Sequence, residues 1–223
     1  MNNSSPDNPP PLATTGAISA DRKDLLLISG LVPERAKLLD IGCGQGELLA
    51  LLKTQKQIDG RGLELSQRGV NACVARGLAV IQGDADSDLQ HYPDQAFDYV
   101  ILSQTLQTIR HPANVLNELA RIGRKLIVSI PNFGHWQVRW HLLSQGRMPK
   151  TRLLDANWYD TPNIHLCTLS DFNQLCATLG LAIENCITLT NGKAQHLQHA
   201  PSRWHNWFAE QAVFVLYKNK SDE

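Results

Sequence analysis

The chain has 223 residues, of which 43% are hydrophobic, and its formal net charge is +0. These values predict one α/β domain with a sizeable core, exclude a disordered chain, and argue against a polyanionic partner such as nucleic acid. Five cysteines at irregular spacing, no apolar stretch that could span a membrane and no recognisable signal peptide together predict a cytoplasmic protein with free thiols and no metal site.

The N-terminal region divides into a tail and a helix. Residues 1–20 are rich in Asn, Ser, Pro and Thr, so they cannot bury enough apolar surface to offset the entropy of ordering, and we expect a flexible tail. Apolar residues at helical spacing follow between Leu25 and Leu31, and Pro33 ends the helix that they predict. We expect residues 21–223 to form a single domain.

The next segment predicts a strand, a glycine loop and a helix. The apolar strand Ala36–Ile41 has an acid near its end, Asp40, and three glycines then alternate with other residues at Gly42, Gly44 and Gly46. Glycines in such a loop allow positive φ angles and let the backbone approach a ligand closely. A plain strand–turn–helix junction that binds nothing is the alternative.

The spacing of this loop indicates its ligand class. Glu47 stands where the dinucleotide fingerprint needs its third glycine, and no Gly-Lys-Ser/Thr follows, so a dinucleotide oxidoreductase and a P-loop are both disfavoured. The Asp-x-Gly-x-Gly-x-Gly pattern resembles the first motif of class I S-adenosylmethionine methyltransferases. The amino-acid end of that cofactor has a carboxylate, which suits the loop amides and the helix N-terminus, and an ammonium group, which suits Asp40.

Polar residues also follow three further predicted strands. These strands are Gly60–Leu65, Ala79–Ile81 and Phe97–Leu102. Glu64 lies about 20 residues past the loop, where βαβ folds place a ribose-binding carboxylate; a solvated acid is the alternative. By resemblance to class I methyltransferases, Asp84 accepts from the adenine amino group, and we expect Ser103 to line the same cofactor site. All three meet at the carboxyl edge of a parallel sheet, where open α/β sheets bind ligands.

The alternation of strands and helices predicts the fold class. A helix is expected at Asn114–Ile122, and the remaining strands at Lys125–Ile130, Leu181–Leu189 and Ala212–Tyr217, with an excursion from Gly192 to Trp207. Right-handed crossovers between such elements build a doubly wound, Rossmann-like sheet of the class I methyltransferase type. We expect it to be mostly parallel, with an antiparallel last strand at or near the edge.

An aromatic insert is expected at about residues 131–168. It contains a short amphipathic helix around Trp136 and Trp140, followed by a long polar and aromatic loop from Trp158 to Thr168. Loops of this length in a compact domain are usually functional or form a lid. His165 and Cys167 alone are too few ligands for zinc, so we predict no metal there.

Five stretches together resemble one family, that of the methionine biosynthesis protein MetW, and the resemblance covers about residues 21–168. They are Leu39–Gly44, Ser103–Gln107, Pro131–Trp136, Gly146–Pro149 and Trp158–Thr168. The first is generic to the fold and the last three are the most specific. The resemblance implies an S-adenosylmethionine pocket and a role in methionine biosynthesis with homoserine O-acyltransferase. It implies no methyl acceptor, and the residues past about Leu189 depart from the short C-terminus of the family.

One functional hypothesis is an S-adenosylmethionine-dependent methyltransferase of an unidentified small molecule. Methyl transfer from a sulfonium is an in-line displacement, so the protein must position a nucleophile and supply a base if that nucleophile carries a proton. His135 and His165 are the candidate bases, with Tyr159 and Asp160 shaping the acceptor pocket. The alternative is that both histidines are hydrogen-bonded structural residues, because no triad spacing accompanies them.

The second hypothesis is an accessory subunit that senses S-adenosylmethionine, the downstream product of the pathway. In that case an aromatic surface around Trp136, Trp140, Trp158 and Tyr159 meets the acyltransferase, since aromatic residues are favoured at binding hot spots. The alternative is that these residues have only a structural role and form the core of the insert itself. A methyltransferase needs the insert to form an acceptor pocket, whereas an accessory protein can leave it exposed.

Overall fold

The computed structural model describes residues 22–151, 154 and 156–219, so the expected tail at 1–20 lies outside the described residues. Strands and helices alternate through the first half of the chain, as the sequence predicts. The helices are α1 (Lys23–Leu31), α2 (Glu47–Lys56), α3 (Gln67–Ala75), α4 (Pro112–Ile122), α5 (Trp136–Gln145), α6 (Leu169–Thr178) and α7 (Arg203–Phe208). The short 3-10 turns are η1 (Leu89–His91) and η2 (Leu106–Thr108).

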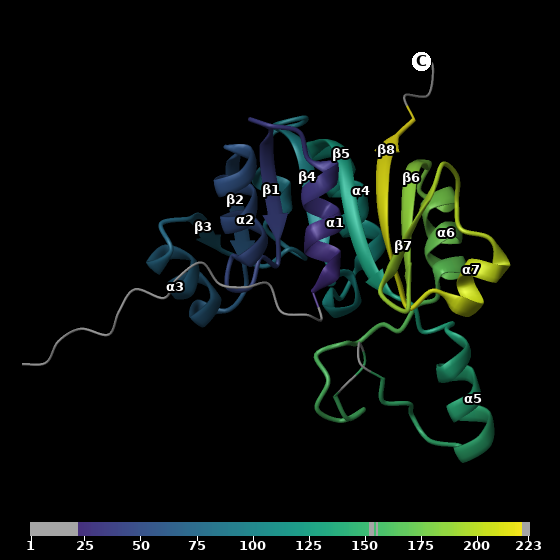
Figure 1. Cartoon of the computed structure of the whole chain (residues 1–223). Coiled ribbons are helices and arrows are strands. Elements are labelled where there is room, and N and C mark those ends of the chain that lie inside the picture. The colour runs from purple at the N-terminus through teal and green to yellow at the C-terminus, as the bar shows by residue number, and fades with distance from the viewer. Residues whose placement is uncertain (1–21, 152–153, 155, 220–223) are drawn as a thin grey trace, which may run out of the picture.

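One sheet of eight strands organises the molecule (Figure 1). The strands are β1 (Lys37–Ile41), β2 (Asp59–Glu64), β3 (Ala79–Gln82), β4 (Phe97–Ser103), β5 (Gly123–Pro131), β6 (Leu181–Thr190), β7 (Lys193–Leu197) and β8 (Gln211–Lys218). Their order is β3-β2-β1-β4-β5-β8-β6-β7, and β3 to β5 pair in parallel. This confirms the predicted doubly wound α/β fold of the class I methyltransferase type.

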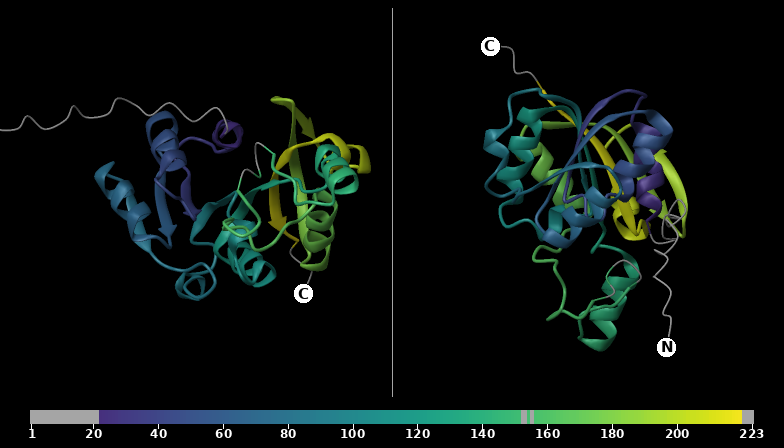
Figure 2. Two further views of the ribbon diagram at one scale, coloured as in Figure 1. Left: turned by 90° about the horizontal axis from the view of Figure 1, so that it is seen from below. Right: turned by 90° about the vertical axis from the view of Figure 1, so that its left-hand side faces the viewer.

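Helices cover both faces of the sheet, and neighbouring strand residues alternate between two cores (Figure 2). In β1, Leu38 packs with α1 and α2 on one face, whereas Leu39 packs with α4 on the other. Strands that are buried on both faces appear in the sequence as continuous apolar runs, and for this reason their positions can be predicted from the sequence. The reversal of strand order beside β1 opens the carboxyl edge for a ligand.

The last strand is antiparallel, as predicted, but its expected position at or near the edge is corrected. β8 lies between β5 and β6, and β6 pairs on its other side with β7, which forms the edge. The physical reason is burial on two faces: Val213 and Val215 enter one core, and Phe214 and Leu216 the other. The expected excursion from Gly192 to Trp207 contains β7 and most of α7.

The insert projects from the carboxyl edge between β5 and α6 (Figure 1). Asn132, which is 3% exposed, fixes both of its ends. Its amide nitrogen donates to the carbonyls of Asn206 and Ala209, and its oxygen accepts from the backbone of Gly134 and Leu169. None of the helices in the part of the chain that the structure describes has the length and apolar character to span a bilayer.

Replacing Asn132 with alanine tests this anchor. Asn132→Ala leaves buried donors and acceptors without partners, so we expect the free energy of unfolding to fall by about 2–4 kcal/mol in urea titrations. Asn157→Ala is the matched control, because the Asn157 side chain donates to the exposed Asp160 in the same insert. Its expected change is within about 0.5 kcal/mol. Equal losses in the two variants would contradict the anchoring role.

Candidate functional site

The glycine loop lies between β1 and α2, at the carboxyl edge of the sheet. Gly42, Gly44 and Gly46 have φ angles of 66°, 56° and 76°, the left-handed region that disfavours other residues. A Cβ on Gly42 would lie 2.5 Å from the side chain of Thr105, so this glycine also allows a close approach to the β4 loop. A Cβ on Gly44 would meet no atom within 4 Å, so its backbone borders open space.

Glu64 ends β2 and holds the loop in place. It is buried, and one carboxylate oxygen accepts from the Gly44 amide at 2.8 Å. The other oxygen accepts from the amide and the hydroxyl of Ser66, at 2.9 and 2.7 Å, at the start of α3. Glu64 therefore joins the glycine loop to the next helix, and its remaining lone pairs are what a ribose diol could use.

Two cavities open beside the loop and share Gly42 in their walls. The first, of about 220 Å³, is lined by Asp40, Gly44 and Ser103 together with Arg22 from the segment before α1. The second, of about 180 Å³, is lined by Asp84 and by apolar side chains that include Leu63 and Ile109. Five of the seven predicted cofactor residues line these cavities, whereas Gly46 and Glu64 line neither.

A buried network behind the first cavity was not predicted. Asp24 of α1 is 0% exposed and accepts from the hydroxyls of Ser103 and Ser129, at 2.8 and 3.3 Å. Arg22 bonds to Asp24 at 3.2 Å and donates to the Ser103 hydroxyl at 2.9 Å. Ser103 is thus engaged on two sides. From sequence, Asp24 is indistinguishable from an ordinary first-turn acid that complements the helix dipole.

Burial dominates the electrostatics of Asp40. Desolvation raises the pKa of its carboxyl to about 7, Glu64 and Asp24 raise it further, and the positive charge of Arg22 opposes the shift. Asp40 is therefore partly protonated at neutral pH. A cation placed in the first cavity would favour its ionised form, which makes this carboxyl suited to an ammonium group.

Asp84 sits in the second cavity as part of a turn. Its carboxylate accepts from the Asp86 amide at 2.9 Å, and its own amide donates to Asp88 at 2.8 Å. Asp86 in turn accepts from the amides of Arg110 and His111, which ties this turn to the start of α4. The loop is thereby held beside the apolar wall of the cavity.

The three candidate catalytic residues line different cavities. His135 is buried at the start of α5, and desolvation lowers its pKa. His165 is exposed, and its ring nitrogen lies 3.3 Å from the Arg110 carbonyl. Tyr159 is 67% exposed and packs edge-on against Trp158. The structure does not bring them together, so their catalytic role stays a prediction.

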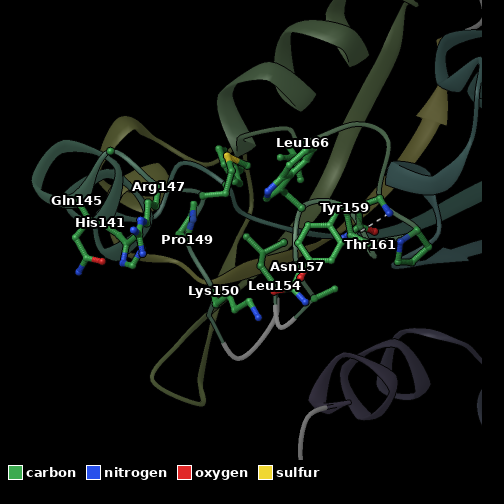
Figure 3. Close-up of a pocket in the computed structure, with 17 residues that line it drawn as sticks. His141, Gln145, Arg147, Pro149, Lys150, Leu154, Asn157, Tyr159, Thr161 and Leu166 are labelled. Atoms are coloured by element: carbon green, nitrogen blue, oxygen red, sulfur yellow. Dashed lines mark hydrogen bonds between the residues drawn. The ribbon is translucent and has the colours of Figure 1, made fainter.

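A larger cavity, of about 830 Å³, lies within the insert (Figure 3). Apolar side chains such as Leu154 and Leu166 line it, with Tyr159 and the basic residues Arg147 and Lys150. None of the described residues that line it also lines the two cavities beside the glycine loop. Among the described residues no cluster of three or more His, Cys, Asp or Glu side chains could hold a metal.

Comparison with known proteins gives a family and a fold. Residues 22–216 match the family model described as methionine biosynthesis protein MetW. The chain is 32% identical over 210 residues to the bifunctional methionine biosynthesis protein MetXA/MetW of Rhodopirellula baltica. That alignment covers 90% of this chain and 33% of the relative, so the chain spans about a third of the relative's length.

Solved structures of methyltransferases share the fold. An S-adenosylmethionine-dependent methyltransferase of Thermotoga maritima, described as a possible histamine N-methyltransferase, superposes with a TM-score of 0.65 at 18% identity, covering 90% of this chain and 89% of that one. The [4+2]-cyclase SpnF superposes with a TM-score of 0.62 at 17% identity, covering 90% and 82%. A cyclase among these structures indicates that the fold alone does not determine methyl transfer.

The raised pKa of Asp40 predicts a pH dependence of stability. In the unfolded chain the carboxyl ionises near its ordinary value of 3.8, and in the folded protein near 7. Between these values the folded state retains a proton that the unfolded state has lost, so the free energy of unfolding falls as the pH rises from 4 to 7, by at most about 4 kcal/mol. Urea titrations of wild type and Asp40→Asn across this pH range measure the decrease, which we expect in wild type alone. If the free energy of unfolding varied with pH in the same way in both proteins, the assignment to Asp40 would be contradicted.

Proposed function

The chain belongs to the methionine biosynthesis protein MetW family, and from that premise we propose that it is an S-adenosylmethionine-binding accessory subunit of homoserine O-acyltransferase. The observation that carries the binding proposal is the pair of cavities that share Gly42. Their walls differ in chemistry, as the two ends of this cofactor do.

The first cavity suits the amino-acid end. An α-amino acid carries an ammonium group and a carboxylate. The cavity offers Asp40 for the ammonium group and Arg22 for the carboxylate. Ser103 supports this arrangement by positioning Arg22. The positive sulfonium is favoured by the surplus of negative charge from Asp24, Asp40 and Glu64.

The second cavity suits adenine. Leu63, Leu65 and Ile109 provide an apolar wall for a flat ring, and Asp84 provides an acceptor for its amino group. Glu64 is bonded to Gly44 of the first cavity and follows Leu63 of the second in β2, so it is the carboxylate that we assign to the ribose hydroxyls. When bound, S-adenosylmethionine would either supply an activated methyl group or report the level of the pathway's downstream product.

The partner proposal rests on the fused relative. One chain of Rhodopirellula baltica is named for both MetXA and MetW, and this chain matches about a third of it. Fusion keeps two proteins at high effective concentration, which favours a pair that acts together. The resemblance of the insert to the MetW family implies the same partner, homoserine O-acyltransferase.

A methyltransferase of an unidentified small molecule is the second candidate. The cavity of about 830 Å³, with Tyr159 in its wall, is the observation that favours it, because an acceptor needs a pocket of that kind. That cavity has no described lining residue in common with the cofactor cavities, and His135 and His165 lie elsewhere. In-line transfer needs acceptor and methyl group in contact, so we favour the accessory role.

Calorimetry on Glu64→Ala tests the ribose assignment. We expect the variant to bind S-adenosylmethionine about 10–100-fold more weakly, because two charge-assisted hydrogen bonds are lost. Ser66→Ala is the matched control: it removes the hydrogen bonds of the Ser66 hydroxyl to Glu64 and to the Gly69 amide but keeps the carboxylate. Equal affinity of wild type and Glu64→Ala would contradict the assignment of Glu64 to the ribose. Equal losses of affinity in Glu64→Ala and Ser66→Ala would show that the weaker binding is caused by loosening of the loop.

Co-purification tests the partnership. Tagged chain and homoserine O-acyltransferase from the same organism are expected to elute together, and S-adenosylmethionine is expected to shift the affinity of the complex about 5-fold or more. By linkage the acyltransferase then shifts the affinity for S-adenosylmethionine by the same factor, which calorimetry can check. Absence of a complex, together with methyl transfer to homoserine-derived metabolites, would favour the methyltransferase instead.

A further inference from the structure

The tryptophans of this chain are concentrated in one region and none is buried. All five lie in the insert or in α7, and each is between 44% and 72% exposed. They are Trp136, Trp140, Trp158, Trp204 and Trp207. Tryptophan is usually largely buried, so a concentration of exposed rings indicates a surface that another molecule covers.

Helix α5 separates these rings into two sides. Trp136, Trp140 and Leu143 are spaced i, i+4, i+7 and share one face, with exposures of 44%, 63% and 80%. His141 and Gln145, which line the large cavity, point to the opposite side of the helix, at 3.6 residues per turn. Trp158 and Tyr159 line that cavity too, so the aromatic set expected from sequence is divided between the cavity and an outer face.

Helix α7 extends the outer face. The guanidinium of Arg139 in α5 lies 4.4 Å from the centre of the Trp207 ring, which links the two helices. Trp204 stacks on Phe208 with ring centres 5.9 Å apart and an angle of 7°. We define the outer ridge by six residues. They are Trp136, Trp140, Leu143, Trp204, Trp207 and Phe208. In Figure 1, α7 lies at the lower right end of the sheet and α5 projects below that edge, on the right of the picture.

The charges of these two helices have one sign. Helix α5 (Trp136–Gln145) carries Arg139, helix α7 (Arg203–Phe208) carries Arg203, and neither helix contains Asp or Glu. A matching partner surface is apolar at its centre and acidic at its rim, because complementary charges favour specific association.

We infer that the outer ridge is the surface that docks homoserine O-acyltransferase, an inference that rests on the proposed function. The relative from Rhodopirellula baltica is named for both MetXA and MetW in one chain, which supports a protein as the occupant of this surface. Rigid aromatic side chains supply contact area at low entropic cost, and the contact with Arg139 restrains the Trp207 ring before binding.

Matched variants of the full chain test this surface. The double variant Trp140→Ala, Leu143→Ala alters the ridge, and Trp158→Ala removes an equally exposed ring on the cavity side. We expect the double variant to raise the Kd for the acyltransferase at least 10-fold, and Trp158→Ala to change it less than 2-fold. Arg203→Glu, at the end of the ridge, is expected to slow association, with an effect that shrinks in high salt.

The outcomes separate the surface from the partnership. All variants must bind S-adenosylmethionine as wild type does, which shows that they fold. If wild type does not bind the acyltransferase, the proposed function fails. If wild type binds but the ridge double variant binds equally well, or Trp158→Ala alone loses binding, the surface assignment is overturned. If light scattering shows that the wild type is a dimer and that the ridge variant is a monomer, a second copy of this chain occupies the ridge and the surface assignment is overturned. If the ridge is needed for binding to anionic lipid vesicles, a membrane occupies it and the assignment is overturned as well.

Discussion

Three carboxylates, those of Asp24, Asp40 and Glu64, lie close together at the carboxyl edge of the sheet, and the way each is compensated constrains the rest of the site. Asp24 bonds to Arg22, whereas Asp40 and Glu64 lie within the same field. Buried like charges are costly unless each is compensated. Asp24 is compensated by Arg22 and two hydroxyls, Glu64 by backbone and hydroxyl donors, and Asp40 by holding a proton up to about pH 7.

This arrangement connects the fold to the choice of ligand. Asp24 belongs to α1, Asp40 to β1 and Ser129 to β5, so the network joins the helix before the sheet to its central strands. Under the proposed function, the ammonium group of S-adenosylmethionine supplies positive charge where Asp40 otherwise needs a proton. The fold thus places beside the glycine loop a carboxyl whose ionisation depends on what occupies the first cavity.

The sequence predicts those parts of the site that have local signals. Glycines at alternate positions after an apolar strand, and acids at the ends of Gly60–Leu65 and Ala79–Ile81, lie at the expected edge because strand ends are readable from periodicity. Asp24 has no such signal, since its burial depends on hydroxyls from β4 and β5 that are distant in sequence. The interior position of β8 was missed for a similar reason, because strand order depends on long-range pairing. In the same way, the division of the insert aromatics into two sides depends on how α5 is rotated against Asn132 and α7.

The insert and the cofactor cavities meet along the segment from Ser103 to Arg110. Ser103 and Thr105 line the cavities, and η2 follows directly with Gln107, whose carbonyl accepts from the amides of Ile164 and His165 in the insert. The Gln107 side chain donates to the Gln104 carbonyl, so this carbonyl anchor is rigidly connected to the end of β4. The carbonyl that anchors the insert loop therefore belongs to the same short segment as Thr105, whose side chain lies against Gly42 and lines the second cavity. Because Asn132 anchors the insert separately to the α7 region and to the start of α6, the insert is held both by the segment that lines the cavities and by the C-terminal helices.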